Sequence, residues 1–257
     1  MKVYFIGAGP GAADLITLRA KNLIEKCPVI LYAGSLVPVE VLSYALDNAK
    51  IIDTASLTLE EIIQHIGEAK KTDQDVARLH SGDPSIYGAI AEQMRCLDNL
   101  KIDYEIIPGV SSFTAAAAVL KKELTLPSIS QTIILTRTNG VASSMPEKED
   151  LKKLAQSCAT LAIYLSIKNI KSIIKTLKPL YGETCPIVIC YRVSWPDQLI
   201  VQATLETILE KLKPHKLTRT ALILVGWVLS DDQQFTDSKL YDPTHQHLLR
   251  PAKKSIS

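Results

Sequence analysis

The sequence predicts an α/β protein built from two α/β domains with mostly parallel sheets and a cleft between the domains. Three observations predict this class. Short apolar β-type runs alternate with segments of helical periodicity, the alternation occurs in two successive series, and a linker-like stretch at residues 123–128 separates the series. Such alternation is typical of parallel sheets covered by helices. The predicted parts are residues 1–122, residues 123–242 and a polar tail at 243–257.

The first series begins with the apolar strand at residues 3–6, and the helix at 59–70 has its clearest amphipathic stripe. Its other strands are expected at 29–32, 51–52, 76–79 and 104–107, and its other helices at 15–25, 39–46, 86–97 and 111–120. In the second series we expect strands at 132–135, 160–165, 187–191, 200–205 and 221–225, and helices at 151–158, 170–177 and 207–212.

Composition excludes several classes of protein. The chain has 257 residues, of which 47% are hydrophobic and 22% charged, as in globular domains. Lys and Arg number 29 and Asp and Glu 27, a balance that gives no electrostatic footprint for nucleic acid. The longest apolar stretch, residues 221–229, has about half the length of a membrane span. The apolar start is too short for a signal peptide, so we expect a cytoplasmic protein with no membrane partner.

The cysteines indicate no redox or metal chemistry. There are five, an odd number, and none has C-x-x-C spacing, which argues against a disulfide framework and against a zinc site. The histidines are scattered along the chain. We therefore expect no bound metal.

A glycine loop follows the first predicted strand. Gly7-Ala8-Gly9-Pro10-Gly11-Ala12 matches the dinucleotide fingerprint G-x-G-x-x-G/A. That fingerprint also needs an acidic residue near the end of the second strand, and residues 29–36 contain none. The loop is therefore either a nucleotide site or a tight turn that needs glycine. An NAD(P)-dependent oxidoreductase and a non-catalytic nucleotide-binding module both remain competing interpretations.

Two more loops follow later strands of the first series. Gly82-Asp83-Pro84 comes after the strand at 76–79, and Pro108-Gly109-Val110-Ser111-Ser112 after the next one. Asp83 before Pro84 fits a helix N-cap, and it also fits a carboxylate that binds a ligand. Because open α/β sheets bind ligands at the carboxyl ends of their strands, we expect the three loops to form one rim. No Ser/His/Asp or Cys/His set is evident, so the catalytic residue is left unassigned.

These three loops, together with residues 15–20, closely resemble the tetrapyrrole methyltransferases of cobalamin biosynthesis. Residues 32–37, 85–93, 113–127 and 131–137 resemble the subgroup that methylates C11 of precorrin-4 or cobalt-precorrin-4. The resemblance covers roughly residues 1–240. It implies two α/β domains, a homodimer and a methyl donor, S-adenosylmethionine (SAM), that leaves as S-adenosylhomocysteine. Other family members, which methylate C17, C20 or uroporphyrinogen-III, are the alternatives.

The resemblance also implies site residues. The cofactor residues are Gly82, Asp83, Ile86, Ser111, Ser112, Leu165, Val193, Ala221 and Leu222. The substrate residues are Gly9, Pro10, Gly11, Tyr32, Ser35, Leu36 and Arg137. Arg19 and Lys122 are further candidates for binding substrate carboxylates. Ala12 departs from the family pattern, since the uroporphyrinogen-III methylases have an aspartate there, and this weakens that alternative.

Overall fold

The computed structural model describes residues 1–140, 144–231, 235–238, 240, 242, 245, 246 and 248. Contacts divide the chain into two compact units. The first unit holds Met1–Lys121 with two later segments, Cys190–Ile200 and Thr220–Leu222. The rest of the chain makes up the second unit. Most of the predicted tail at 243–257 lies outside the described residues.

The first unit contains a five-stranded sheet in the order β3-β2-β4-β1-β5, and all of its paired strands are parallel. Its strands are β1 (Lys2–Gly7), β2 (Val29–Tyr32), β3 (Lys50–Asp53), β4 (Val76–His80) and β5 (Asp103–Ile107). Its helices are α1 (Leu18–Ile24), α2 (Leu59–Lys71), α3 (Ala91–Asn99) and α4 (Ser112–Leu120). The expectation of parallel strands is confirmed here.

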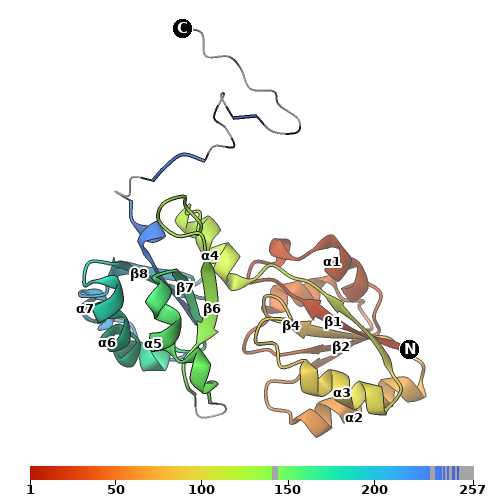
Figure 1. Cartoon of the computed structure of the whole chain (residues 1–257). Coiled ribbons are helices and arrows are strands. Elements are labelled where there is room, and N and C mark those ends of the chain that lie inside the picture. The colour runs from red at the N-terminus through yellow and green to blue at the C-terminus, as the bar shows by residue number, and fades with distance from the viewer. Residues whose placement is uncertain are drawn as a thin grey trace. The chain divides into compact units, whose positions relative to one another are not determined.

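Helices cover both faces of this sheet (Figure 1). On one face, Phe5 and Leu31 pack with Ile66 of α2 and Leu97 of α3. On the other face, Ile6 and Ile30 pack with Ala20 and Ile24 of α1. Neighbouring residues of a strand point to opposite faces, so fully apolar strands serve both layers at once.

Helix α2 forms where its stripe predicts. Thr58 caps it through a reciprocal capping box, in which the Thr58 hydroxyl accepts from the Glu61 amide and the Glu61 carboxylate accepts from the Thr58 amide. Ile62, Ile66 and Ala69 are its buried face. Residues i, i+4 and i+7 lie on one side of a helix, which explains the stripe.

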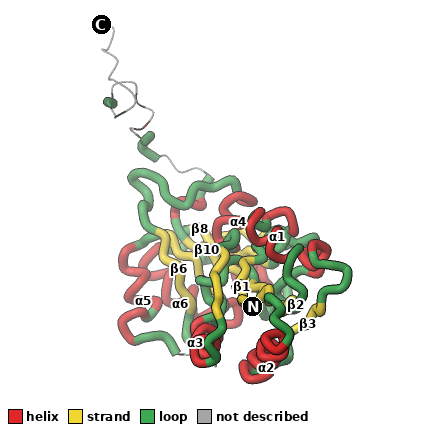
Figure 2. Tube along the Cα trace, turned by 90° about the vertical axis from the view of Figure 1, so that its right-hand side faces the viewer, coloured by secondary structure: helices red, strands yellow, loops and turns green. Residues whose placement is uncertain are grey.

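The second unit contains a mixed sheet in the order β6-β7-β10-β8-β9. Strands β6 and β7 are parallel, whereas β7 and β10 are antiparallel, so the sheet is less parallel than expected. The strands of this sheet are β6 (Ile133–Arg137), β7 (Thr160–Tyr164), β8 (Pro186–Tyr191), β9 (Leu199–Thr204) and β10 (Ala221–Val225). The end of β8 and the first residues of β9 and β10 fall in the segments assigned to the first unit. The helices of the second unit are α5 (Leu151–Leu154), α6 (Ile170–Tyr181) and α7 (Ile208–Leu212), and α5 and α6 lie beside one another (Figure 2).

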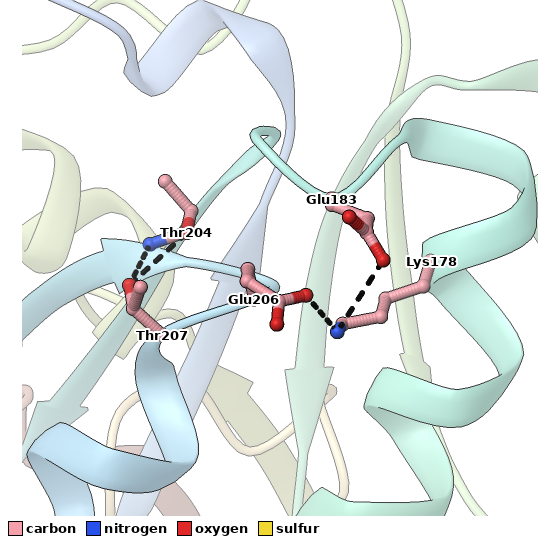
Figure 3. Close-up of polar contacts among 5 residues, drawn as sticks. All are labelled: Lys178, Glu183, Thr204, Glu206 and Thr207. Carbon is pink, nitrogen blue, oxygen red and sulfur yellow. Dashed lines mark hydrogen bonds and ion pairs between the residues drawn. The ribbon is translucent and has the colours of Figure 1, made fainter.

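Helix α6 carries the main buried face of this unit, with Ile173, Ile174 and Leu177 inside. At its carboxyl end Lys178 forms ion pairs with Glu206 and, at 3.8 Å, with Glu183 (Figure 3). Both glutamates are more than half exposed, so this cluster contributes little to stability.

Candidate functional site

Three loops of the first unit lie against one another at the carboxyl ends of β1, β4 and β5. The Ala8 amide donates to the His80 carbonyl (2.8 Å), and Gly9 and Gly82 exchange two backbone hydrogen bonds (3.3 and 2.7 Å). Parallel pairing of β1 with β4 and β5 brings these ends to the same edge of the sheet. The structure thus brings together the three loops that were expected to form one rim.

Glycine is needed in these loops for close approach of backbone to backbone. A Cβ atom on Gly7 would lie 2.5 Å from the Gly109 Cα, and one on Gly109 would lie 2.1 Å from the Gly82 carbonyl oxygen. Both distances are far below van der Waals contact. Gly82 also has a φ of +65°, a conformation that glycine adopts without strain.

Asp83 ties two of the loops together. One of its carboxylate oxygens accepts from the Ser85 amide (2.8 Å) and the other from the Gly109 amide (2.9 Å). It does not cap a helix, because α3 begins at Ala91 and not at residue 86 as predicted. Positive φ angles at Tyr87 (+55°) and Ala89 (+49°) interrupt the helix that the apolar spacing indicated.

Helix α4 begins directly after the third loop. Ser111 occupies the N-cap position and is buried, but its side chain makes no capping hydrogen bond. Ser112 is the first residue of the helix and is half-buried. The first-turn amides of α4 therefore have no N-cap side chain as their hydrogen-bond acceptor. Amides in this position bind anionic groups of ligands.

The glycine loop is covered by a segment that lies far away in the sequence. The Ser194 hydroxyl accepts from the Ala12 amide (2.9 Å), and the Trp195 indole donates to the Pro10 carbonyl (3.0 Å). A Cβ atom on Gly11 would lie 2.3 Å from Trp195 Cδ1, so the indole occupies the space next to this glycine. Gly9, Pro10 and Gly11 are buried, and Trp195, which packs beside Gly11, is half-buried.

This covering argues against dinucleotide binding. In a Rossmann site the amides at the start of the first helix bind the pyrophosphate. Here the Ala8, Gly9 and Ala12 amides already donate to protein oxygens. The glycine motif therefore serves as a tight turn that other segments of the chain pack against.

Beside this covered loop lies a cavity of about 350 Å³. Arg192 stacks over the Trp195 ring at 3.9 Å and forms an ion pair with Asp197. The predicted substrate segment after β2 contributes to the opposite wall, in which Gly34 donates to Asp53 (2.9 Å). The lining residues are Gly34, Val37, Pro38, Val39, Glu40, Arg192, Trp195, Pro196 and Asp197.

The predicted substrate residues at and after the end of β2 differ in how far they are exposed to solvent. Tyr32 is half-buried at the end of β2, whereas Ser35 and Leu36 are exposed. Trp195 was missed as a site residue, although Val193, two residues earlier, was predicted and is buried. A signal existed, since Trp195 is one of only two tryptophans in the chain and precedes a proline.

Ala221 and Leu222 are buried at the start of β10, directly after Thr220, whose carbonyl accepts from the Arg192 amide (3.0 Å). Ile86 is half-buried in the turn that follows Asp83. Ala221, Leu222 and Ile86 all belong to the first unit.

Leu165, Arg137 and the candidate cation Lys122 belong to the second unit. Leu165 follows β7 with a φ of +52°, and it is 74% exposed. An exposed leucine held in a left-handed conformation is strained, and such strain is typical of functional sites. Arg137 ends β6 and donates to the Ser144 carbonyl (3.2 Å) beside a second cavity of about 290 Å³.

The other two candidate cations have structural contacts. Lys122 donates to the Ser230 carbonyl and to Asp231, both at 2.7 Å. Arg19 is an exposed side chain that lies 3.7 Å from Glu105. Among the described residues, no group of His, Cys, Asp and Glu could hold a metal ion, and no helix is long and apolar enough to cross a membrane.

Comparison with known proteins identifies the family. A sequence profile of the tetrapyrrole (corrin/porphyrin) methylases matches residues 2–209. The chain belongs to the tetrapyrrole methylases. Among curated members, the precorrin-4 C(11)-methyltransferase of Pseudomonas aeruginosa is 51% identical over 98% of this chain and 100% of its own length. The cobalt-precorrin-4 C(11)-methyltransferase of Methanocaldococcus jannaschii is 48% identical over 99% and 98%.

Solved structures of tetrapyrrole methylases have the same fold. The X-ray structure of a cobalt precorrin-4 methyltransferase of cobalamin biosynthesis matches with a TM-score of 0.86 and 39% identity, over 89% of this chain and 96% of that one. The uroporphyrin-III C-methyltransferase of Thermus thermophilus, in complex with S-adenosylhomocysteine, matches with a TM-score of 0.74 and 27% identity, over 89% and 93%. The predicted fold class and family are confirmed.

Proposed function

We propose that this chain transfers a methyl group from SAM to C11 of precorrin-4 or cobalt-precorrin-4. The observation that carries the proposal is identity of about 50%, over nearly the whole chain, to enzymes named for that reaction. A uroporphyrinogen-III C-methyltransferase of Bacillus subtilis is only 33% identical. Ala12, the position where the uroporphyrinogen-III methylases have an aspartate, also favours the C11 reaction.

The residues at the rim of the first unit fit SAM. Asp83 uses each carboxylate oxygen for one amide, and each oxygen has a second lone pair that can accept from an ammonium or a ribose hydroxyl. The α4 amides can bind a carboxylate, and Ile86 offers an apolar contact. We propose Gly82, Asp83, Ile86, Ser111 and Ser112 as cofactor residues, together with Leu165, Val193, Ala221 and Leu222.

For the macrocycle, we propose the cavity beside the glycine loop, with Tyr32, Ser35 and Leu36 from the segment after β2. Pro10 and Gly11 contact Trp195, which lines this cavity. We propose Gly9, Pro10 and Gly11 as substrate residues beside it, and Arg137 as a residue that binds a substrate carboxylate. SAM supplies a methyl group that is already electrophilic on its sulfonium. The chain's own contribution is then to bind, orient and exclude water, and orientation alone can lower a barrier by about 7–11 kcal/mol.

Two binding and activity measurements test the function. Calorimetric titration should give binding of S-adenosylhomocysteine and none of NADH. Incubation with SAM and each macrocycle, with and without cobalt, should give a product that has gained one methyl group at C11. Binding of NADH in place of S-adenosylhomocysteine would support the oxidoreductase, and methylation at C17 or C20 would reassign the chain within its family.

We further propose that the enzyme is cytoplasmic, and that it is a homodimer, as the family resemblance implies. Analytical ultracentrifugation checks the assembly, where a sedimenting mass of twice 28.2 kDa is expected. Fractionation of cells that express the protein checks its location.

A further inference from the structure

Three buried polar side chains of the first unit form a continuous network of hydrogen bonds between two backbone carbonyls. The Gln93 amide donates to the Ala89 carbonyl (2.9 Å), and Arg78 Nε donates to the Gln93 oxygen (3.2 Å). Arg78 Nη1 donates to the Thr54 hydroxyl (3.0 Å), which in turn donates to the Tyr32 carbonyl (3.0 Å). Arg78, Gln93 and Thr54 are each at most 6% exposed.

The positive charge of Arg78 in this hydrogen-bond network is unusual. Burial lowers the pKa of Arg78 to about 10, and in the described part of the chain no carboxylate pairs with it. A buried guanidinium without a counter-ion is costly to keep, and a packed apolar side chain would be the simpler solution. Both acceptors of Arg78, Gln93 and Thr54, are neutral, so they do not compensate its charge. Arg78 therefore has a purpose other than stabilising the fold.

That purpose follows from the direction of the hydrogen bonds. A guanidinium can only donate, so it must face the oxygen of the Gln93 amide. The NH₂ end of Gln93 is then directed at Ala89, whose carbonyl it binds. Arg78 thus fixes which way the Gln93 amide points.

Ala89 lies in the turn that interrupted the predicted helix. Tyr87 and Ala89 both have positive φ angles, which residues with a side chain avoid, so the turn needs support from outside. Gln93 supports Ala89 through this hydrogen bond, and the buried His80 side chain lies near the backbone of Gly88. Gln93 and His80 are both buried side chains.

We propose that Gln93, oriented by Arg78, is a positioning residue that holds the Tyr87–Ala89 turn in the form that binds the cofactor. The inference rests on the proposed function, because Ile86 and Asp83 in the same loop are proposed SAM residues. Gln93 itself touches no substrate; it acts through the turn.

Two substitutions separate positioning from stability. Gln93→Glu keeps the shape and gives Arg78 a carboxylate, but it places an oxygen against the Ala89 carbonyl. Thr54→Val removes one acceptor of Arg78 and leaves the bond from Gln93 to Ala89 intact. We expect Gln93→Glu to weaken S-adenosylhomocysteine binding about tenfold in calorimetry with little change in Tm. We expect Thr54→Val to lower Tm and to leave that affinity within about twofold of wild type.

If Gln93 had only a structural role, the loss of affinity in each variant would follow its loss of Tm. Thr54→Val would then lose more affinity than Gln93→Glu. The inference is overturned if Gln93→Glu binds like wild type, or if Thr54→Val loses as much affinity. Should Gln93→Glu fail to fold, Gln93→Met takes its place with the same expected loss. Wild-type protein that binds no S-adenosylhomocysteine overturns the proposed function instead. Hydrogen exchange across residues 86–90 then decides the inference, and faster exchange in Gln93→Glu is the supporting result.

Discussion

At the scale of single residues, Asp83 uses both of its carboxylate oxygens to join two loops. One accepts from the Ser85 amide and the other from the Gly109 amide. Asparagine can accept at only one of these positions, because its other terminal group is a donor. The substitution Asp83→Asn therefore removes two things at once, the negative charge of the side chain and one of its two acceptor oxygens.

We expect Asp83→Asn to lower the free energy of unfolding by about 1–3 kcal/mol, since one backbone amide loses its acceptor. It should also weaken S-adenosylhomocysteine binding about tenfold or more, because a charged acceptor is lost. Calorimetric scans and titrations measure the two effects. Asp53→Asn is the matched control, since the amides of Gly34 and Ala55 both donate to the same Asp53 oxygen and asparagine keeps that oxygen. Equal Tm values for the two variants would contradict the assignment.

His80 is a second residue whose environment makes a measurable prediction. Burial and the nearby Arg78 charge lower its pKa to about 3, whereas it titrates near 6.5 in an unfolded chain. As pH falls through this window, the unfolded chain binds a proton that the folded chain does not. The stability that neutral His80 maintains is therefore complete above pH 6.5 and is lost toward pH 3, by up to about 1.4 kcal/mol per pH unit.

The variant His80→Gln should remove this component. Between pH 7 and pH 5 we expect the wild-type free energy of unfolding to fall by about 2 kcal/mol more than that of the variant. Denaturant titrations at several pH values measure the difference, and the other histidines are common to both proteins. Parallel curves for the two proteins would mean that His80 is protonated or solvated in the fold.

At the scale of elements, the glycines differ in what surrounds them. Gly11 lies under the Trp195 indole, which is rigid and is held by the Pro10 carbonyl. Gly67 lies inside α2, where a Cβ atom would meet no described atom within 4 Å apart from the backbone of its own helix. The same substitution should therefore have opposite effects at the two positions.

We expect Gly67→Ala to raise stability by up to about 1 kcal/mol, because alanine favours helix more than glycine does. Gly11→Ala should lower stability and displace Trp195, since its Cβ would overlap the ring. Thermal scans report stability, and a red shift of tryptophan fluorescence reports the displaced indole. A Gly11→Ala protein with wild-type Tm and emission would show that the covering segment is not held as described.

Sequence patterns predicted the elements that depend on local periodicity, and they failed where distant contacts decide. Helix α2 and the buried strands followed from apolar spacing. Residues 39–46 were expected to be helical, but the structure has only a 3₁₀ turn at Val39–Tyr44. The start of α3 was placed five residues early because Gln93 and Arg78, which support the Tyr87–Ala89 turn, leave no local signal. Trp195 was missed for the same reason, since it contacts the glycine loop across 185 residues.

At the scale of the whole molecule, ligand binding and folding are linked. A ligand that binds only the folded chain stabilises it by RT ln(1 + [L]/Kd), which is about 2.7 kcal/mol at a hundred times Kd. For a protein of this size, 1 kcal/mol corresponds to a change in Tm of about 2–4 °C. The melting curve therefore distinguishes a ligand that binds the folded chain, which raises Tm, from one that does not bind, which leaves Tm unchanged.

We expect saturating S-adenosylhomocysteine to raise the Tm of the wild-type chain by roughly 5–11 °C. NADH at the same concentration should leave Tm unchanged, because the Ala8, Gly9 and Ala12 amides of the glycine loop already donate to His80, Gly82 and Ser194. At a fixed concentration below saturation, Asp83→Asn should gain less than wild type, whereas Asp53→Asn should gain as much. An equal rise with both ligands would assign the glycine loop to a nucleotide after all, and a rise with NADH alone would replace the methyltransferase by an oxidoreductase.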